Sequence, residues 1–515
     1  MDQSKRLIIN SICSVFSLLV QLSIGIFLVP YILHHLTKEV YGIWALTGSL
    51  LGYFTLLTLG LNSAVNRYVP MHLVNNDWDS MNRVINTTLF FYVVCGMIIL
   101  VATVFIIFNF VSWFAIPETY RVASIMVVAI SGIGLAWIVP LTVFSAVLSG
   151  LQRYELQSVS NISSRFTRVI AIIAIFRAGL GFVALSIVTV AANLFNHCIT
   201  AYFAIKKCKK LKFNWRFVSW STFRDMFAYS VNSFIYATGG LIQLQAGKLM
   251  IGWMMGAGLV TEYEMPSFLL LQLTALVMAG AKVMKPAASS LDAQKKYKHI
   301  QIMYLLGVKY AFMIVIPNTI LFILFGKAIM NIWLNEASFV GTSAQVLMIL
   351  AIPEMFRLGH VSAYFVVVGL GKHKVFGITT FVTGITSIIL AYLIEIFLHL
   401  GVISIAIGFA IPNLVTSAFI IPLYCCRTVG LKLKDVFYQT YTPAIFSCIP
   451  FCTYLVFMRI VYCPTVIVQL LILLGVGLLI LLFSWWIIGF KAEEKIRFLG
   501  YLLIRKEKIH SRAIL

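Results

Sequence analysis

Three side chains that could bind or exchange charged groups lie in one apolar stretch of the chain. Glu354, Arg357 and His360 follow one another at intervals of three between residues 343 and 369. Residues at positions i and i+3 share one face of a helix, so the carboxylate and the guanidinium can form an ion pair. Alternatively, the arginine can bind a phosphate with two parallel hydrogen bonds. Pro353 predicts a kink at the same depth.

Two lysines lie in other apolar stretches and also have two interpretations. Lys309 lies near the middle of residues 301–325, from where its long side chain can reach the nearer membrane surface. A reversal of the chain at Gly256 would bring Lys248 close to Glu262 or Glu264. Each lysine could therefore be satisfied locally or help to bind an anion.

Further polar candidates are uncharged or isolated. Asn10, Asn193, Asn232 and Asn413 lie in apolar stretches, where they could bond sugar hydroxyls or neighbouring helices. Glu395, like Glu354, could carry a proton or sodium ion that drives transport. No nucleophile motif, metal-ligand cluster or paired cysteine spacing accompanies them, so we expect no catalytic residue, metal site or disulfide.

The composition shows which elements must position these residues. Of 515 residues, 61% are hydrophobic and only 11% are charged, against about 25% charged in soluble domains. A bilayer core needs about 20 apolar residues per helix, and the alternation of a membrane barrel is absent. The chain is therefore expected to be an all-α polytopic membrane protein. About fourteen spans are expected, at 7–30, 40–62, 84–111, 122–148, 157–177, 180–205, 227–253, 258–281, 301–325, 343–369, 375–396, 401–425, 441–461 and 465–489.

Basic residues indicate the orientation of these spans. The net charge of +22 falls in short clusters between apolar stretches, which indicates topology and argues against a nucleic-acid partner. Most clusters lie on loops of the N-terminal side, so both termini are predicted to be cytoplasmic. The cluster at 206–213 fits either a topology anchor or a patch for anionic lipids. Lys248, Lys309 and Arg357 are the basic residues expected inside spans, all in the second half.

Short sequences recur about 220 residues apart and predict two parallel six-helix repeats around a central cavity. The matches are Asn10-Ser11 with Asn232-Ser233, Tyr41 with Tyr263, Gly150-Leu151 with Gly369-Leu370, Leu180-Gly181 with Leu400-Gly401, and Asn193-Leu194 with Asn413-Leu414. The expected domains are two bundles at 1–213 and 214–435, two additional helices at 436–490, and a basic cytoplasmic tail at 491–515.

Three segments resemble a known family over nearly the whole chain. In residues 27–69, "YGIW" leads into a helix that ends in "LG" and "RY"; "KLMIGWMMGAGLVTEY" at 248–263 and "VVVGLGKHKVFG" at 366–377 are similar to later parts of the family pattern. The family is that of the polysaccharide and O-antigen flippases in the multidrug, oligosaccharidyl-lipid and polysaccharide exporter (MOP) superfamily. Many of its members have an acid immediately before the basic residue that Lys248 matches, whereas this chain has Gly247.

The resemblance implies a flippase that carries a polyprenyl-diphosphate-linked oligosaccharide, such as an O-antigen repeat unit of lipopolysaccharide, by alternating access. It implies a bacterial inner membrane, no cofactor, coupling to a proton or sodium gradient, and partners among polysaccharide polymerases and chain-length proteins. Arg357, Lys309 and Lys248 would then bind the anionic head group. Glu354, His360 and Glu395 would pair with them or serve in coupling.

Two other classes of function fit less well. A cation-coupled multidrug exporter of the same superfamily would favour acidic groups deep in both bundles, but the first six expected spans contain none, although Glu354 remains in the second half. A membrane glycosyltransferase or polymerase would need an acid/base pair and large outer loops. The longest outer loop expected here, at 326–342, contains the charges Lys327 and Glu336, so we expect no enzyme.

Overall fold

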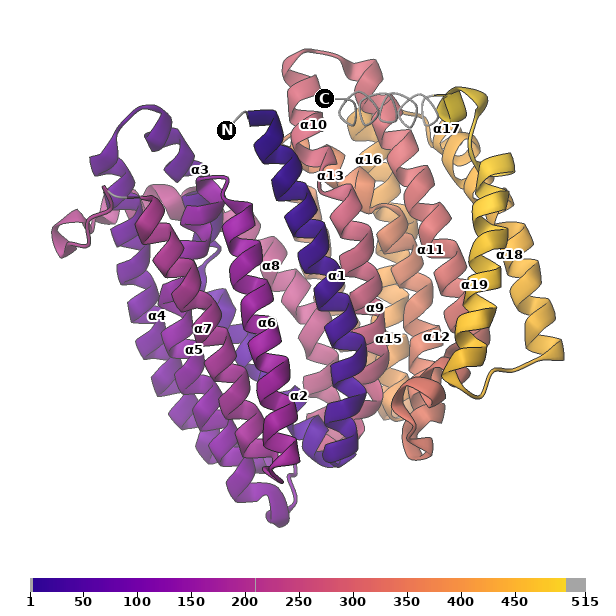
Figure 1. The fold of residues 1–515 in the computed structure, drawn as a ribbon, viewed down its shortest axis with the longest axis horizontal. Coiled ribbons are helices and arrows are strands. Elements are labelled where there is room, and N and C mark those ends of the chain that lie inside the picture. Colours follow the sequence, from indigo (N-terminus) through magenta and orange to yellow (C-terminus); the bar gives the residue numbers. More distant parts are fainter. Residues whose placement is uncertain (1–2, 209, 497–515) are drawn as a thin grey trace, which may run out of the picture. The chain divides into compact units, whose positions relative to one another are not determined.

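The computed structural model describes residues 3–208 and 210–496, and every regular element among them is a helix (Figure 1). The α-helices are α1 (Gln3–His35), α2 (Lys38–Gly52), α3 (Leu61–Val74), α4 (Trp78–Trp113), α5 (Arg121–Gly150), α6 (Tyr154–Arg177), α7 (Phe182–Lys207), α8 (Trp220–Met255), α9 (Val260–Ala281), α10 (Met284–Ala293), α11 (Tyr297–Leu334), α12 (Ala337–Gly359), α13 (Val361–Gly369), α14 (Lys374–Leu398), α15 (Val402–Val415), α16 (Ile421–Val429), α17 (Leu433–Val436), α18 (Thr442–Val461) and α19 (Ile467–Ser484).

The helices confirm the expected polytopic membrane protein. Within the described residues, 13 stretches are long and apolar enough to cross a membrane. The remaining expected span, at 227–253, coincides with α8, whose 36 residues include several serines, glutamines and glycines. At about 1.5 Å per residue α8 exceeds the thickness of a bilayer core, so part of it extends beyond the core. Each expected span thus overlaps one or more helices.

Two expected segments differ in detail. The span at 343–369 is interrupted at His360, where α12 ends and α13 begins, whereas Pro353 lies inside α12. The outer loop expected at 326–342 is mostly helical, because α11 continues to Leu334 and α12 begins at Ala337.

Contacts divide the chain into two compact units that interleave along the sequence. The first unit comprises residues 1–272 and 373–412, and the second comprises 273–372 and 413–515. The division into successive bundles at 213 and 435, and the repeat behind it, stay predictions. The short helices α3 and α10, which the sequence reading did not anticipate, begin at Leu61 and Met284 and so occupy corresponding places in that repeat.

The first unit has a tightly packed core around α4, α5 and α7, which run side by side (Figure 1). Tyr92 on α4 and Val143 on α5 are fully buried there. A Cβ added at Gly96 would lie 2.7 Å from the carbonyl oxygen of Ala136, so only glycine permits this approach of α4 to α5. Such small residues are typical of helix contacts in membranes.

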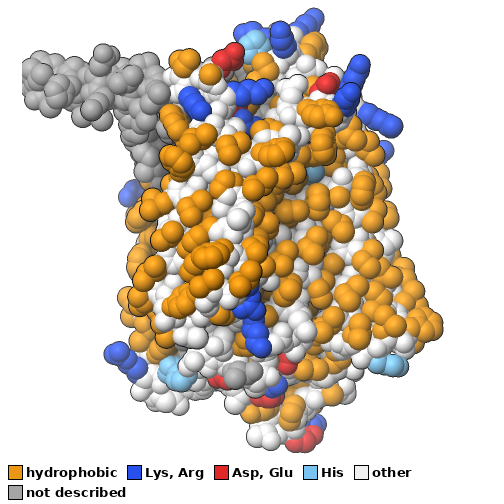
Figure 2. Space-filling view, turned by 90° about the vertical axis from the view of Figure 1, so that its right-hand side faces the viewer, with side chains coloured by type: hydrophobic (Ala, Val, Ile, Leu, Met, Phe, Trp, Pro, Cys, Tyr) orange, Lys and Arg blue, Asp and Glu red, His pale blue; other side chains and the backbone are white. Residues whose placement is uncertain are grey.

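The second unit packs α11 against α12 and α18, with Phe325, Phe451 and Leu473 in one buried cluster. Figure 2 faces the side on which α18 and α19 lie, and hydrophobic side chains cover a broad band of it. Lysines and arginines gather mainly at one rim of this band. The pattern is that of helices that bury their apolar surface in lipid.

Candidate functional site

The three polar residues of the stretch 343–369 are each hydrogen-bonded within the second unit. Arg357 Nε donates to Glu354 Oε2 at 2.7 Å, and Arg357 Nη2 contacts Glu354 Oε1 as well. Thr274 of α9 completes the group: its hydroxyl donates to Glu354 Oε1 at 2.6 Å and accepts from Arg357 Nη2 at 3.0 Å. The Arg357 side chain is 39% exposed and that of Glu354 is 16% exposed. The ion pair predicted from the i, i+3 spacing is therefore present.

His360 stabilises the junction of α12 and α13. One ring nitrogen, Nδ1, lies 2.8 Å from the carbonyl oxygen of Phe356, and the other, Nε2, lies 2.6 Å from the Tyr441 hydroxyl. The ring is buried and packs edge-on against Phe312. Because both nitrogens are already bonded, the geometry gives His360 a structural role, and its part in coupling stays a prediction.

Lys309 is buried against the end of the described chain. Its side chain is only 1% exposed, and its ammonium lies 3.0 Å and 2.7 Å from the two carboxylate oxygens of Glu494. The backbone N–H of Lys491 donates to the same carboxylate at 2.9 Å. Lys309 thus pairs with a glutamate far away in the sequence. Its expected contact with substrate stays a prediction.

Lys248 is neutralised in the way that the reversal at Gly256 predicts. Gly256 has φ +93°, a conformation that favours glycine, and it ends α8 four residues before α9 begins at Val260. Lys248 Nζ lies 2.9 Å from Glu264 Oε2, while Glu262 lies 3.9 Å from Lys38 Nζ.

The neighbouring position explains why the acid of the family pattern is missing. A Cβ added at Gly247 would lie 2.9 Å from the Tyr263 hydroxyl, so the tyrosine takes the space that a side chain would need. In this chain the acid beside Lys248 comes from α9, as Glu264.

The remaining predicted site residues are dispersed. Glu395 accepts from the backbone N–H of Gly401 at 2.9 Å, which fixes the turn after α14. Asn193 is exposed on α7, and Asn413 is half-buried on α15. The side chains of Asn10 and Asn232 lie outside the described residues. The roles of these four asparagines in binding sugar stay predictions.

Two arginines that the sequence reading left out lie inside a span of the first unit. Helix α6 runs from Tyr154 to Arg177 and is long and apolar enough to cross the membrane, so Arg165 lies at its midpoint and Arg168 one turn farther. The expectation that intramembrane charge belongs to the second half alone is therefore wrong. Both residues lie within the expected span at 157–177. Their position in that span could have identified them as charges inside the membrane.

The hydrogen-bond partners of these arginines in the described residues are neutral groups. Arg165 donates to the carbonyl oxygen of Ser17 at 2.9 Å and to the side-chain oxygen of Gln21 at 2.8 Å, both on α1. The Nε atom of Arg168 is buried and has no hydrogen-bond partner among the described residues. Neither guanidinium has a carboxylate within 4.0 Å in the described part of the chain. By contrast, Lys248, Lys309 and Arg357 are each paired with a glutamate.

The described residues hold no group of three or more histidines, cysteines or acids that could bind a metal ion. The site chemistry available in them is that of buried cations, their glutamate partners and hydrogen-bonding neutral side chains. Cationic side chains of this kind bind phosphate and carboxylate oxygens.

Comparison with known proteins gives related sequences and folds. The sequence model of a family described as polysaccharide biosynthesis protein matches residues 8–292. The uncharacterized membrane protein EpsK of Bacillus subtilis (strain 168) is 21% identical over 431 residues, which cover 83% of this chain and 85% of EpsK. A Shigella flexneri protein named for O-antigen transport is 22% identical over 375 residues, with 71% and 85% covered.

Two solved structures share the fold. The lipid II flippase MurJ in an inward closed conformation has a TM-score of 0.69 at 14% identity, and the match covers 93% of this chain and 98% of MurJ. An inward-facing multidrug resistance transporter of the MATE family and MOP superfamily also has a TM-score of 0.69, at 16% identity with 81% and 96% covered. Because the polysaccharide biosynthesis model spans more than half of the sequence, the chain belongs to the polysaccharide biosynthesis protein family.

Proposed function

We propose that this chain is a flippase that moves a polyprenyl-diphosphate-linked oligosaccharide from the cytoplasmic to the outer face of a bacterial inner membrane. The observation that supports the proposal most directly is the arginine pair on α6. Two guanidinium groups lie inside a span, and no carboxylate of the described residues neutralises either of them.

The cost of these charges argues for an anionic ligand. An arginine near the middle of a membrane helix costs about 2.5–3.5 kcal/mol on insertion scales, so its presence indicates a function. A diphosphate offers oxygens that accept two parallel hydrogen bonds from a guanidinium, each about 1.5–3 kcal/mol when a charge takes part. The same ligand can therefore compensate both arginines.

The rest of the proposed substrate follows from the family and its relatives. The family is described by polysaccharide biosynthesis, and one relative is named for O-antigen transport. A polyprenyl chain can stay in lipid while the diphosphate and sugars pass through the protein by alternating access. Lys248, Lys309 and Arg357 stay candidates for the head group, but each would have to exchange a glutamate for the diphosphate. Coupling of this cycle to a proton or sodium gradient through Glu354 or Glu395 belongs to the same proposal.

A transport assay with two substrates tests the proposal. The purified full chain is placed in proteoliposomes with a fluorescent polyprenyl-diphosphate-linked oligosaccharide, and transfer between leaflets is followed by quenching of the outer leaflet. A parallel set measures efflux of ethidium, a cationic drug. We expect transfer of the lipid-linked oligosaccharide and no ethidium efflux. Ethidium efflux without transfer of the oligosaccharide would make the chain a multidrug exporter instead.

A further inference from the structure

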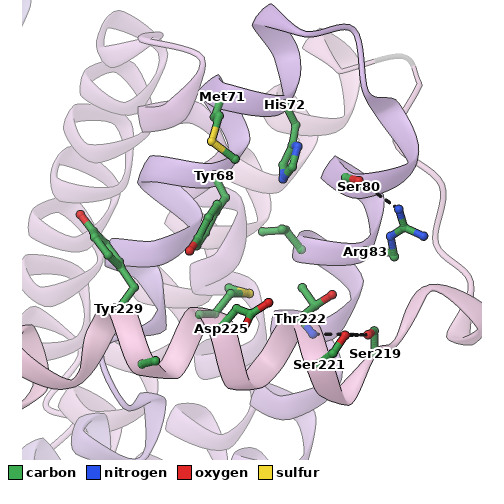
Figure 3. Close-up of a pocket in the computed structure, with 13 residues that line it drawn as sticks. Tyr68, Met71, His72, Ser80, Arg83, Ser219, Ser221, Thr222, Asp225 and Tyr229 are labelled. Atoms are coloured by element: carbon green, nitrogen blue, oxygen red, sulfur yellow. Dashed lines mark hydrogen bonds between the residues drawn. The ribbon is translucent and has the colours of Figure 1, made fainter.

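A polar pocket that none of the residues discussed so far lines lies in the first unit. Figure 3 shows it between α3, the beginning of α4 and the beginning of α8. Its volume is about 680 Å³, which falls within the range of about 300–1,000 Å³ typical of small-molecule sites. By the distribution of basic residues, this end of the helices is predicted to face the cytoplasm.

Buried amides on α4 hold the segment that leads into α8. Asn82 donates to the carbonyl oxygen of Lys210 at 3.1 Å and accepts from the N–H of Lys212 at 2.9 Å. Asn86 donates to the carbonyl oxygen of Lys212 at 2.7 Å and accepts from the N–H of Asn214 at 3.1 Å. The segment that leads into the first turn of α8 is therefore fixed against α4. The backbone on this side of the pocket is held in place by hydrogen bonds.

The beginning of α4 is fixed as well. Asp77 caps the helix, because its Oδ1 accepts from the N–H of Ser80 at 3.0 Å. The hydrogen bonds from Ser80 lower the pKa of Asp77, so the cap stays charged at neutral pH. Arg83 Nη2 donates to the Ser80 hydroxyl at 3.0 Å, which leaves the other guanidinium donors of Arg83 for a ligand.

The pocket combines aromatic faces with a balanced set of polar groups. The rings of Tyr68 and Tyr229 lie 6.2 Å apart at an angle of 67°, and the Arg67 guanidinium lies 4.4 Å from the centre of the Tyr229 ring. In Figure 3 Tyr68 comes from α3, while Asp225 and Tyr229 come from α8. The Asp225 carboxylate makes no hydrogen bond or ion pair with any residue that the structure describes.

The lining identifies the class of ligand. The ionisable residues that line the pocket are His72, Arg83 and Asp225, and the Arg67 guanidinium lies over the Tyr229 ring. The Asp225 carboxylate would repel a phosphate, which favours an uncharged ligand. Hydroxyls of Ser219, Ser221 and Thr222 add donors and acceptors. Tyrosine faces pack against the C–H surfaces of a ring, while hydroxyl, carboxylate and guanidinium groups bond its hydroxyls.

We infer that this pocket binds a neutral sugar residue. The inference rests on the proposed function, because the sugar it would bind is one of the lipid-linked oligosaccharide as that substrate is loaded from the cytoplasm. The pocket then recognises the sugar, whereas the α6 arginines bind the diphosphate. Two regions of the first unit would divide the recognition of one substrate.

Binding of free sugars to the full chain in lipid nanodiscs tests the inference. The probes are glucose, galactose and N-acetylglucosamine, with saturation-transfer NMR as the readout. We expect at least one sugar to bind, and Tyr229→Ala to weaken that binding about tenfold through loss of the aromatic contact. Asp225→Asn keeps the shape of an exposed side chain and should weaken binding less. Tyr202→Ala, which removes an exposed tyrosine from α7, is the matched control and should bind as the parent does.

Several results would overturn the inference. One is failure of the parent protein to bind all three sugars, and another is equal binding by the parent, Tyr229→Ala and Asp225→Asn. Displacement of the bound sugar by inorganic pyrophosphate would indicate an anion site. Lack of displacement by the lipid-linked oligosaccharide would restrict the pocket to free sugars and exclude the loading role.

The same samples separate this inference from the proposed function. The variant Arg165→Ala with Arg168→Ala should lose transfer of the lipid-linked oligosaccharide in proteoliposomes but keep sugar binding. If the parent transfers the oligosaccharide while Tyr229→Ala binds sugar normally, the pocket fails and the flippase stands. If sugar binding depends on Tyr229 but the parent transfers no oligosaccharide, the flippase fails and the sugar site stands.

Discussion

Helices α6 and α12 each hold arginines deep in a span, but the two helices treat the charge differently. On α12, Arg357 bonds Glu354 and Thr274 within the second unit. On α6, Arg165 bonds neutral oxygens of α1, and the buried Nε of Arg168 has no partner in the described residues. The arginine on α12 has a carboxylate partner, whereas neither arginine on α6 has one within 4.0 Å in the described residues.

This difference shows that the position of a charge within a span does not by itself identify a binding residue. Each cation that the sequence reading nominated has a glutamate beside it: Lys248 has Glu264, Lys309 has Glu494, and Arg357 has Glu354. A neutral pair lowers the cost of both charges and requires no ligand. A guanidinium without a carboxylate partner gains more from an anionic ligand, so under the proposed function the head group is expected first at α6.

Removal of the α6 arginines should have the largest effect. In Arg165→Ala with Arg168→Ala, the loss of charge-assisted hydrogen bonds to a diphosphate should cost about 3–6 kcal/mol of substrate binding, or roughly a hundredfold or more. The measurement is transfer of the lipid-linked oligosaccharide at equal protein level. Arg177→Ala, at the exposed end of the same helix, is the control and should transfer normally. Normal transfer by the double variant would contradict the proposal that the α6 arginines bind the diphosphate, and α6 would then not differ from α12 in this respect.

Loss of the ion pair between Lys309 and Glu494 should have the next largest effect. This effect should be on the stability of the protein. Because the Lys309 side chain is 1% exposed, Glu494→Ala leaves a buried ammonium without its counter-charge, at about 3–5 kcal/mol. Thermal unfolding in detergent, followed by tryptophan fluorescence, should show a lower midpoint. Glu493→Ala, at the adjacent position, is the control and should unfold as the parent does. The pairing with Lys309 would be refuted by equal midpoints for the two variants.

The spans were predictable from the sequence because the hydrophobicity of about 20 consecutive residues is a local property. The pairing of Lys248 with Glu264 was also predictable, since a glycine reversal joins the two helices. By contrast, the partners of Lys309 and His360 lie 185 and 81 residues away, and no local pattern indicates them. The same holds for the interruption of the span at His360, whose ring contacts Tyr441.

The α6 arginines show a different kind of failure. Their types and positions were visible within 157–177, but the absence of a carboxylate beside them is a tertiary property. When Arg165 and Arg168 are counted with a cytoplasmic loop, the fact that both lie inside an expected span is overlooked. The sequence does not show which cations are paired with a carboxylate and which are not. This difference decides which cations we expect to bind the anionic head group.

The smallest expected effect concerns the Glu354–Arg357 pair on α12. It is also the most direct test of the difference between α6 and α12. Glu354→Ala leaves Arg357 bonded to Thr274 alone, and since Arg357 is 39% exposed, solvent screening should limit the cost to about 1–3 kcal/mol. If the pair is structural, Glu354→Ala with Arg357→Ala should unfold at a higher midpoint than Glu354→Ala alone, because no unpaired charge remains.

Transfer of the lipid-linked oligosaccharide by the same α12 variants completes the argument. A structural pair predicts that the double variant transfers near the parent rate and that Arg357→Ala does too. If Arg357→Ala instead abolishes transfer at normal stability, Arg357 must leave Glu354 for the substrate during the cycle. The arginines of both helices would then bind the head group, and α12 would differ from α6 only in having a glutamate that neutralises its arginine when no substrate is bound.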